Sequence, residues 1–154
     1  MTQLSIGTVS HGALLAQDLA QALWDALKSV DYPESESIME ELSAIAEDEG
    51  RDEEYDSEVI SDAMDVLQEY APPFCYVGMH EGDASDLGVW FDHGAFEEAC
   101  RDGEVLKVSD SSEIDDMPKE DVAAYNYIAV ISDHGNVSLH HVRVTLGDEI
   151  LSLV

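Results

Sequence analysis

Residues 52–73, DEEYDSEVISDAMDVLQEYAPP, contain the pattern that decides the first half of the fold. Apolar side chains recur every three or four positions, which predicts a helix over 52–70. The apolar stripe consists of Tyr55, Val59, Ala63, Leu67 and Tyr70. Acids occupy positions on the opposite side, so we expect Tyr55, Val59 and Leu67 to hold the helix against a core. Ala71-Pro72-Pro73 then ends the helix, because proline cannot donate the backbone hydrogen bond.

Two further helices are predicted before this stretch. Tyr32-Pro33 separates them, and the second runs from about Glu34 to Glu49 with Ile38, Leu42 and Ile45 buried. The first runs from about 11 to 30, with Ser10 as its N-cap and leucines at helical spacing. The start of the chain, from Met1 to Val9, is expected to be extended.

After Pro73 the pattern changes to short β-type runs. The expected strands are 74–79, 87–91, 105–108, 125–131 and 137–144, with a short helix over 94–101. The last two strands flank Ser132-Asp133-His134-Gly135-Asn136, a turn of hairpin length. We therefore predict an α+β fold, in which N-terminal acidic helices pack with a C-terminal antiparallel sheet of four to five strands. The chain is expected to form one domain, 1–154, mainly helical over 1–71 and mainly β over 72–154.

The charge of the chain is large, negative and concentrated. Its 154 residues include 35 Asp and Glu against 6 Lys and Arg, a formal net charge of -29. Sixteen of the acids lie between Asp31 and Glu69, where Arg51 is the only basic residue. The 45% apolar content still supplies a core. Such a surface repels nucleic acid and attracts proteins that grip nucleic acid.

The spacing of the acids suggests that they imitate a phosphate backbone. Over the predicted third helix they give roughly one charge per 3.6 Å of axis, against about 3.4 Å for one DNA strand. The eight residues are Asp52, Glu53, Glu54, Asp56, Glu58, Asp62, Asp65 and Glu69. A carboxylate also accepts a bidentate arginine contact much as phosphate does. A solvated helix face, or adaptation to a salty cytoplasm, is the competing explanation, but it predicts acids spread more evenly.

Catalytic and metal-binding patterns are not found in the sequence. His80 and His93 lie near Asp83 and Asp92, which makes a metal-dependent enzyme chemically conceivable. No His-Glu-x-x-His, Cys-x-x-Cys, nucleophile elbow or phosphate-binding glycine loop occurs, however. We therefore expect no catalytic residue, metal or cofactor. The two cysteines are expected to be free, and the absence of a signal peptide or a long apolar run predicts a soluble, cytoplasmic protein.

Several motifs resemble those of small acidic proteins of unknown role from phages and mobile elements. These motifs include Tyr70-Ala71-Pro72-Pro73, Cys75-Tyr76-Val77-Gly78 and Asp86-Leu87-Gly88, and later Asp133-His134-Gly135-Asn136. The resemblance implies a mobile-element origin and no particular activity.

A shorter stretch is similar to the ArdA antirestriction proteins, which are DNA mimics. The similarity covers Tyr76-Val77-Gly78, Gly88-Val89-Trp90-Phe91-Asp92 and Phe96-Glu97-Glu98-Ala99-Cys100. These segments look like two strands and a helix of the first ArdA domain. The acidic helices of this chain precede the matched block instead of following it.

The sequence therefore predicts a non-enzymatic, phage-type anti-defence protein. It would block the basic groove of a host DNA- or RNA-handling complex, such as a restriction enzyme or CRISPR effector, without binding nucleic acid or membrane itself. The predicted contact residues are Glu40, Glu47, Asp48, Asp52, Glu53, Glu54, Glu58, Asp62, Asp65 and Glu69. The alternative function is that of an acidic module that neutralises another basic protein. A third possible function is that of a metal-dependent enzyme that uses the His80–His93 region. A homodimer would extend the acidic surface.

Overall fold

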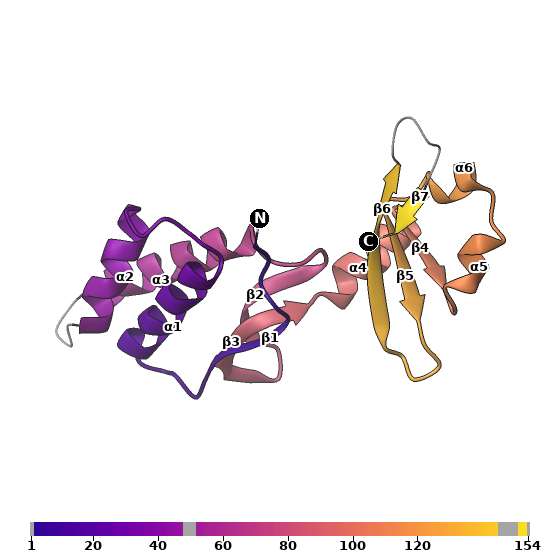
Figure 1. Cartoon of the computed structure of the whole chain (residues 1–154). Helices are drawn as coiled ribbons and strands as arrows, with labels where there is room; N and C mark the ends of the chain where they lie inside the picture. Colours follow the sequence, from indigo (N-terminus) through magenta and orange to yellow (C-terminus); the bar gives the residue numbers. More distant parts are fainter. Residues whose placement is uncertain (1, 48–51, 145–150, 154) are drawn as a thin grey trace. The chain divides into compact units, whose positions relative to one another are not determined.

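The computed structural model describes residues 2–47, 52–144 and 151–153 (Figure 1). The chain has the mixed α+β fold that the sequence predicts. Its packing divides it into two compact units, Met1–Asp92 and His93–Val154. The three N-terminal helices thus share a unit with the first strands, and the expectation of a single domain stays a prediction.

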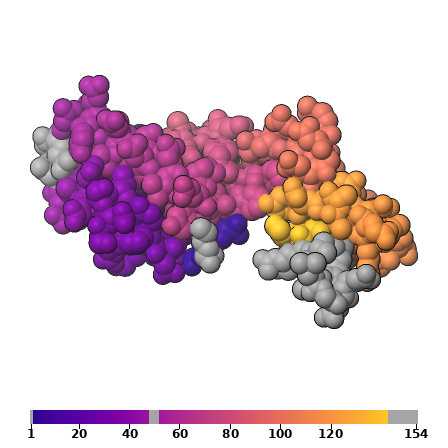
Figure 2. Space-filling view, turned by 90° about the horizontal axis from the view of Figure 1, so that it is seen from above, coloured from indigo at the N-terminus to yellow at the C-terminus, as the bar shows by residue number. Residues whose placement is uncertain are grey.

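Three helices form one layer of the first unit: α1 (Ala16–Ser29), α2 (Ser37–Glu47) and α3 (Glu53–Gln68). Each buries apolar residues at helical spacing. The most deeply buried ones are Ala20, Leu23 and Leu27 of α1, Met39, Leu42 and Ile45 of α2, and Val59, Ala63 and Leu67 of α3. Each buried leucine contributes about 1.5–3 kcal/mol to folding. The space-filling view shows this helical part, indigo to magenta, as a closely packed body (Figure 2). No helix within the described ranges is long and apolar enough to cross a membrane.

A three-stranded antiparallel sheet completes the first unit. It consists of β1 (Gly7–His11), β2 (Cys75–His80) and β3 (Asp83–Phe91), in the order β1-β3-β2. Alternate residues of β3, Leu87 and Val89, are buried in the same core as the helices. The sheet therefore anchors the helical layer from one side.

The other face of this sheet carries a pair of glycines beneath a tryptophan. Gly78 and Gly88 are partners in the β2–β3 register, and the Trp90 indole N–H donates to the Gly78 carbonyl at 3.0 Å. A Cβ atom on Gly88 would lie 2.5 Å from the Gly7 carbonyl oxygen and 2.5 Å from Trp90 Cζ2. Gly88 is thus required because backbone and indole approach it more closely than any side chain allows.

The second unit contains a four-stranded sheet in the order β4-β5-β6-β7. Its elements are α4 (His93–Arg101), β4 (Val105–Val108), α5 (Ser112–Asp115), α6 (Lys119–Val122), β5 (Tyr127–Ile131), β6 (Val137–Val144) and β7 (Leu151–Leu153). Its core is small, and consists of Val108, Ile114, Val122, Ile128 and Val142. The predicted hairpin is confirmed: β5 and β6 pair antiparallel from Ile131 opposite Val137, and Gly135 has a φ of 79° in the turn.

The structure differs from the sequence-based prediction at the N-terminus. The first helix begins at Ala16 instead of residue 11, and Ser10 lies in β1, paired with β3, instead of capping a helix. Leu14 and Leu15 are 74% and 63% exposed, although their spacing suggested a buried face. The physical reason is Gly12, whose φ of 75° interrupts the chain before a helix can form.

The arrangement of the sheets also corrects the prediction. The strands form two sheets in two units instead of one C-terminal sheet, and β4 pairs parallel with β5. A parallel pair needs a long crossover, and α5 and α6 occupy that connection. Neither short helix was predicted, because four-residue helices leave almost no periodic signal.

Candidate functional site

Five exposed carboxylates form a single row along α3. They belong to Glu54, Glu58, Asp62, Asp65 and Glu69, which are exposed and are called here the α3 acidic stripe. At 100° per residue these five positions fall within an arc of about 80°, so they project in nearly one direction. The Asp52 carboxylate sits at the N-cap of α3 and accepts from the backbone N–H groups of Glu54 and Tyr55 at 3.0 and 3.3 Å.

The opposite side of α3 packs into the core and includes one of the eight acids that were counted in the predicted charge spacing. Asp56 is only 5% exposed, because it shares the buried stripe with Val59, Ile60 and Ala63 at helical spacing. It therefore cannot belong to an acidic surface, which is a correction. Tyr55 was expected to hold the helix in place, yet it is 45% exposed at the edge of the acidic stripe. Its hydroxyl donates to Glu41 Oε2 of α2 at 2.9 Å.

The loss of Asp56 changes the charge spacing. From Glu54 to Glu69 the stripe spans about 22 Å of helix axis, with one carboxylate per about 5.6 Å. The axial spacing of roughly 3.6 Å predicted from the sequence included acids on all sides of the helix. One of them is Glu53, whose position is about 100° around the helix from the nearest stripe residue. The row is thus sparser and straighter than the sequence suggested.

The stripe carboxylates have no positive partners. Within residues 2–47, 52–144 and 151–153, none of the five forms an ion pair or accepts a hydrogen bond. The pKa of the nearby Tyr32 phenol is raised above its usual value. Burial is the largest cause, followed by the charge of Glu36, the Tyr70 phenol and the charge of Glu69. The stripe therefore presents an uncompensated row of negative charge to solvent.

This row costs helix stability. Glu54–Glu58, Glu58–Asp62 and Asp65–Glu69 are like-charge pairs four residues apart, and Asp62–Asp65 are three apart. Asp65 and Glu69 also lie near the C-terminal end of α3, where the helix dipole disfavours negative charge. Folding alone thus does not account for the stripe.

Neutralising two stripe residues should therefore stabilise the fold. Glu58→Gln with Asp62→Asn removes three of the four close like-charge pairs, and we expect the free energy of unfolding to rise by about 1 kcal/mol at low salt. Urea denaturation at low ionic strength measures this increase in the free energy of unfolding. In about 1 M NaCl the increase should vanish, because the charges are screened. An unfolding free energy that falls at low salt would show that the carboxylates are stabilising.

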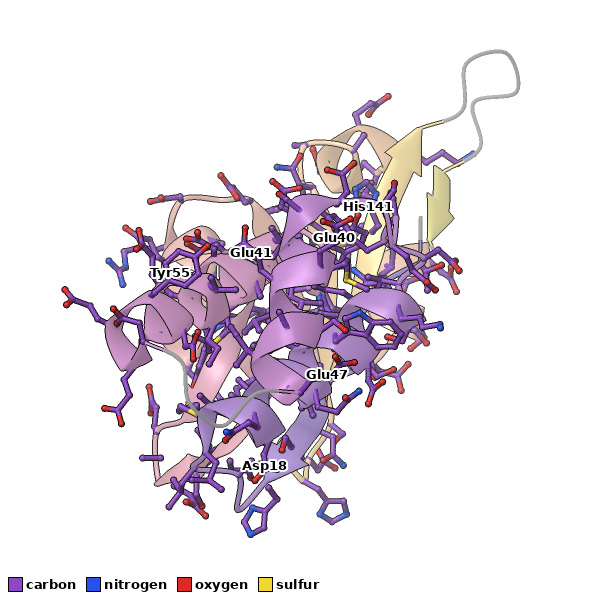
Figure 3. All side chains as sticks on the ribbon, turned by 90° about the vertical axis from the view of Figure 1, so that its left-hand side faces the viewer. Asp18, Glu40, Glu41, Glu47, Tyr55 and His141 are labelled. Carbon is purple, nitrogen blue, oxygen red and sulfur yellow. The ribbon has the colours of Figure 1, made fainter. Side chains whose placement is uncertain are left out.

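The predicted contact residues of α2 lie elsewhere. Glu40 and Glu47 line a pocket together with Trp24 of α1, whereas Glu41 faces α3 through its bond with Tyr55. Figure 3 shows Glu40 and Glu47 on one side of α2 and Glu41 with Tyr55 on the other. The predicted contact residues are therefore divided between the α3 acidic stripe and a separate α1–α2 group. Asp48 lies outside the described residues.

The α1–α2 pocket was not predicted. It has a volume of about 410 Å³ and is lined by Trp24, Glu34, Met39, Glu40, Ser43, Ala44 and Glu47. Trp24 is a large apolar residue in the first helix, yet it is only half-buried. Its spacing of four residues from Lys28 was the one available signal, because such a pair meets on a helix surface.

The histidine region does not assemble a metal site. No group of three or more His, Cys, Asp or Glu side chains suited to a metal ion occurs in the described part of the chain. The His80 ring instead packs edge-on against Trp90, at 4.7 Å between ring centroids, and its Nδ1 accepts from the Gly82 backbone N–H. His80 therefore has a structural role in the β2–β3 turn.

Comparison with known proteins adds no assignment. No family model, curated protein or solved structure matches this chain. The features of the molecule that bear on its function are therefore the charge and geometry of the α3 acidic stripe and of the α1–α2 pocket.

Proposed function

We propose that this protein blocks the nucleic-acid groove of a DNA- or RNA-handling protein by placing the α3 acidic stripe where a strand's phosphates would lie. The observation that carries the proposal is the exposed, unpaired, single-file arrangement of the five carboxylates. A groove lined with arginine and lysine gains a charge-assisted contact for each carboxylate that it accepts. A phage-type inhibitor of a restriction enzyme or CRISPR effector is the role that fits this chemistry.

The geometry favours a groove that holds one strand. The stripe is about 22 Å long, which is the axial length of about six or seven phosphates of one strand. A duplex presents two phosphate rows, one on each side of a groove. The second acidic group, Glu40 and Glu47, lies on the α1 side of α2 and does not supply a parallel row. The stripe thus imitates a single row.

Affinity capture from a bacterial lysate tests the proposal. The tagged protein should recover nucleic-acid-binding proteins at about 0.05 M NaCl and lose them at about 0.5 M, because exposed charge contacts are screened by salt. Nuclease treatment of the lysate should leave the recovery unchanged, since the protein takes the place of the nucleic acid. Partners that lack a nucleic-acid groove would contradict the proposal and favour a module that neutralises another basic protein.

A further inference from the structure

The α1–α2 pocket combines an aromatic wall with carboxylates. Half-buried Trp24 and buried Met39 supply apolar surface, and Glu34, Glu40 and Glu47 are exposed. Glu40 and Glu47 are seven residues apart, or about 10.5 Å along α2. A cation that enters the pocket between them therefore has a carboxylate on either side.

Two residues of the pocket, Trp24 and Glu34, already contact a cation of the chain itself. Lys28 Nζ lies 4.6 Å from the centroid of the Trp24 ring and 3.1 Å from Glu34 Oε1. The ammonium group is thus held by a cation–π contact and an ion pair at once. Lys28 neutralises only Glu34, and Glu40 and Glu47 have no ion-pair partner among the residues described. The pocket retains charge for a second cation.

We propose that this pocket binds an arginine side chain of the partner protein. A guanidinium group is planar, stacks on aromatic faces and is more weakly hydrated than an ammonium, so it suits a tryptophan-lined pocket. Its donors also match the carboxylates of Glu40 and Glu47. The identity of the partner rests on the proposed function, whereas the guanidinium chemistry rests on the pocket alone. An arginine anchored here would fix the register of the α3 acidic stripe in the groove.

Titration with a small guanidinium compound tests the chemistry without any partner. The probe is N-acetyl-arginine amide, and the readout is the Trp24 indole N–H in a proton–nitrogen NMR spectrum, assigned by its loss in Trp24→Phe. We expect a saturable shift with a Kd of about millimolar size. The neutral analogue N-acetyl-citrulline amide should cause no saturable shift, and N-acetyl-lysine amide should bind several-fold more weakly.

Variants of the pocket make the test specific. Glu40→Gln with Glu47→Gln should weaken the arginine probe at least about fivefold, whereas the matched pair Glu81→Gln with Glu120→Gln, at exposed positions outside the pocket, should leave it unchanged. Equal responses to the arginine and citrulline probes, or an unchanged Kd in the pocket variant, would overturn the inference.

A second arm uses the captured partner and separates this inference from the proposed function. The pocket variant should bind the partner at least about tenfold more weakly than the matched pair. If probe binding is saturable but the pocket variant binds the partner normally, an arginine of the partner does not occupy the site and the inference fails. If the probe does not bind while stripe variants abolish capture, the pocket inference fails and the proposed function stands.

Discussion

Charge reversal in the centre of the α3 acidic stripe, by Glu58→Lys, Asp62→Lys and Asp65→Lys, is expected to weaken partner binding at least about 1,000-fold, or about 4 kcal/mol. The three residues are exposed and consecutive in the row, so the change removes three favourable contacts and creates three repulsive ones in a basic groove. Isothermal titration calorimetry against the captured partner measures the loss. Binding within about tenfold of the original would contradict the mimicry account.

A matched control separates position from net charge. Glu81→Lys, Asp102→Lys and Glu120→Lys change the charge by the same amount at exposed positions that do not belong to α3, and two of them are in the second unit. This variant should lose affinity only modestly, through the weaker long-range field. The fold of the stripe variant should be intact, because its substitutions are on the exposed side of the helix. Circular dichroism and thermal unfolding check this for both variants.

Gly88→Ala is expected to destabilise the first unit by about 3 kcal/mol or more. The added Cβ would meet the Gly7 carbonyl oxygen and the Trp90 ring at 2.5 Å each. The indole can rotate away, but the β1 backbone cannot move without breaking its pairing with β3. Urea denaturation followed by tryptophan fluorescence measures the change, because Trp90 lies over the substituted position.

Gly78→Ala is the matched control, because Gly78 is the register partner of Gly88 on the neighbouring strand. A Cβ there would lie 3.6 Å from the Tyr76 ring, an ordinary contact, so the free energy of unfolding should change by less than about 1 kcal/mol. The double variant Gly88→Ala with Trp90→Ala should not recover stability, since the clash with the Gly7 carbonyl remains. Equal stability of the two single variants would show that β1 does not pack against β3 as described.

Strong periodicity made much of the fold predictable from the sequence. The apolar residues spaced from Val59 to Leu67 predicted α3 to within a few residues, and the turn around Gly135 predicted the β5–β6 hairpin. These signals are local, because each depends on neighbours within one helical turn or one tight turn. The pairing of β1 with β3 joins residues about eighty positions apart, for which a single sequence contains no signal.

The candidate site was predictable only in part for the same reason. The exposed acids of α3 follow from helix periodicity, and the same periodicity places Asp56 on the buried face with Ile60 and Ala63. Counting acids along the chain without assigning them to faces led to a charge spacing that was too dense. The direction of Glu40 and Glu47 depends on how α2 packs against α1, which is a tertiary property.

Competition for the partner's groove tests the central claim most directly. A fluorescent single-stranded oligonucleotide is bound to the captured partner, and this protein is added while fluorescence anisotropy is recorded. Competition predicts complete displacement by the natural protein at saturating concentration, and little by the Glu58→Lys, Asp62→Lys, Asp65→Lys variant at the same concentration. A ternary complex, in which the partner holds oligonucleotide and protein together at saturation, would contradict it.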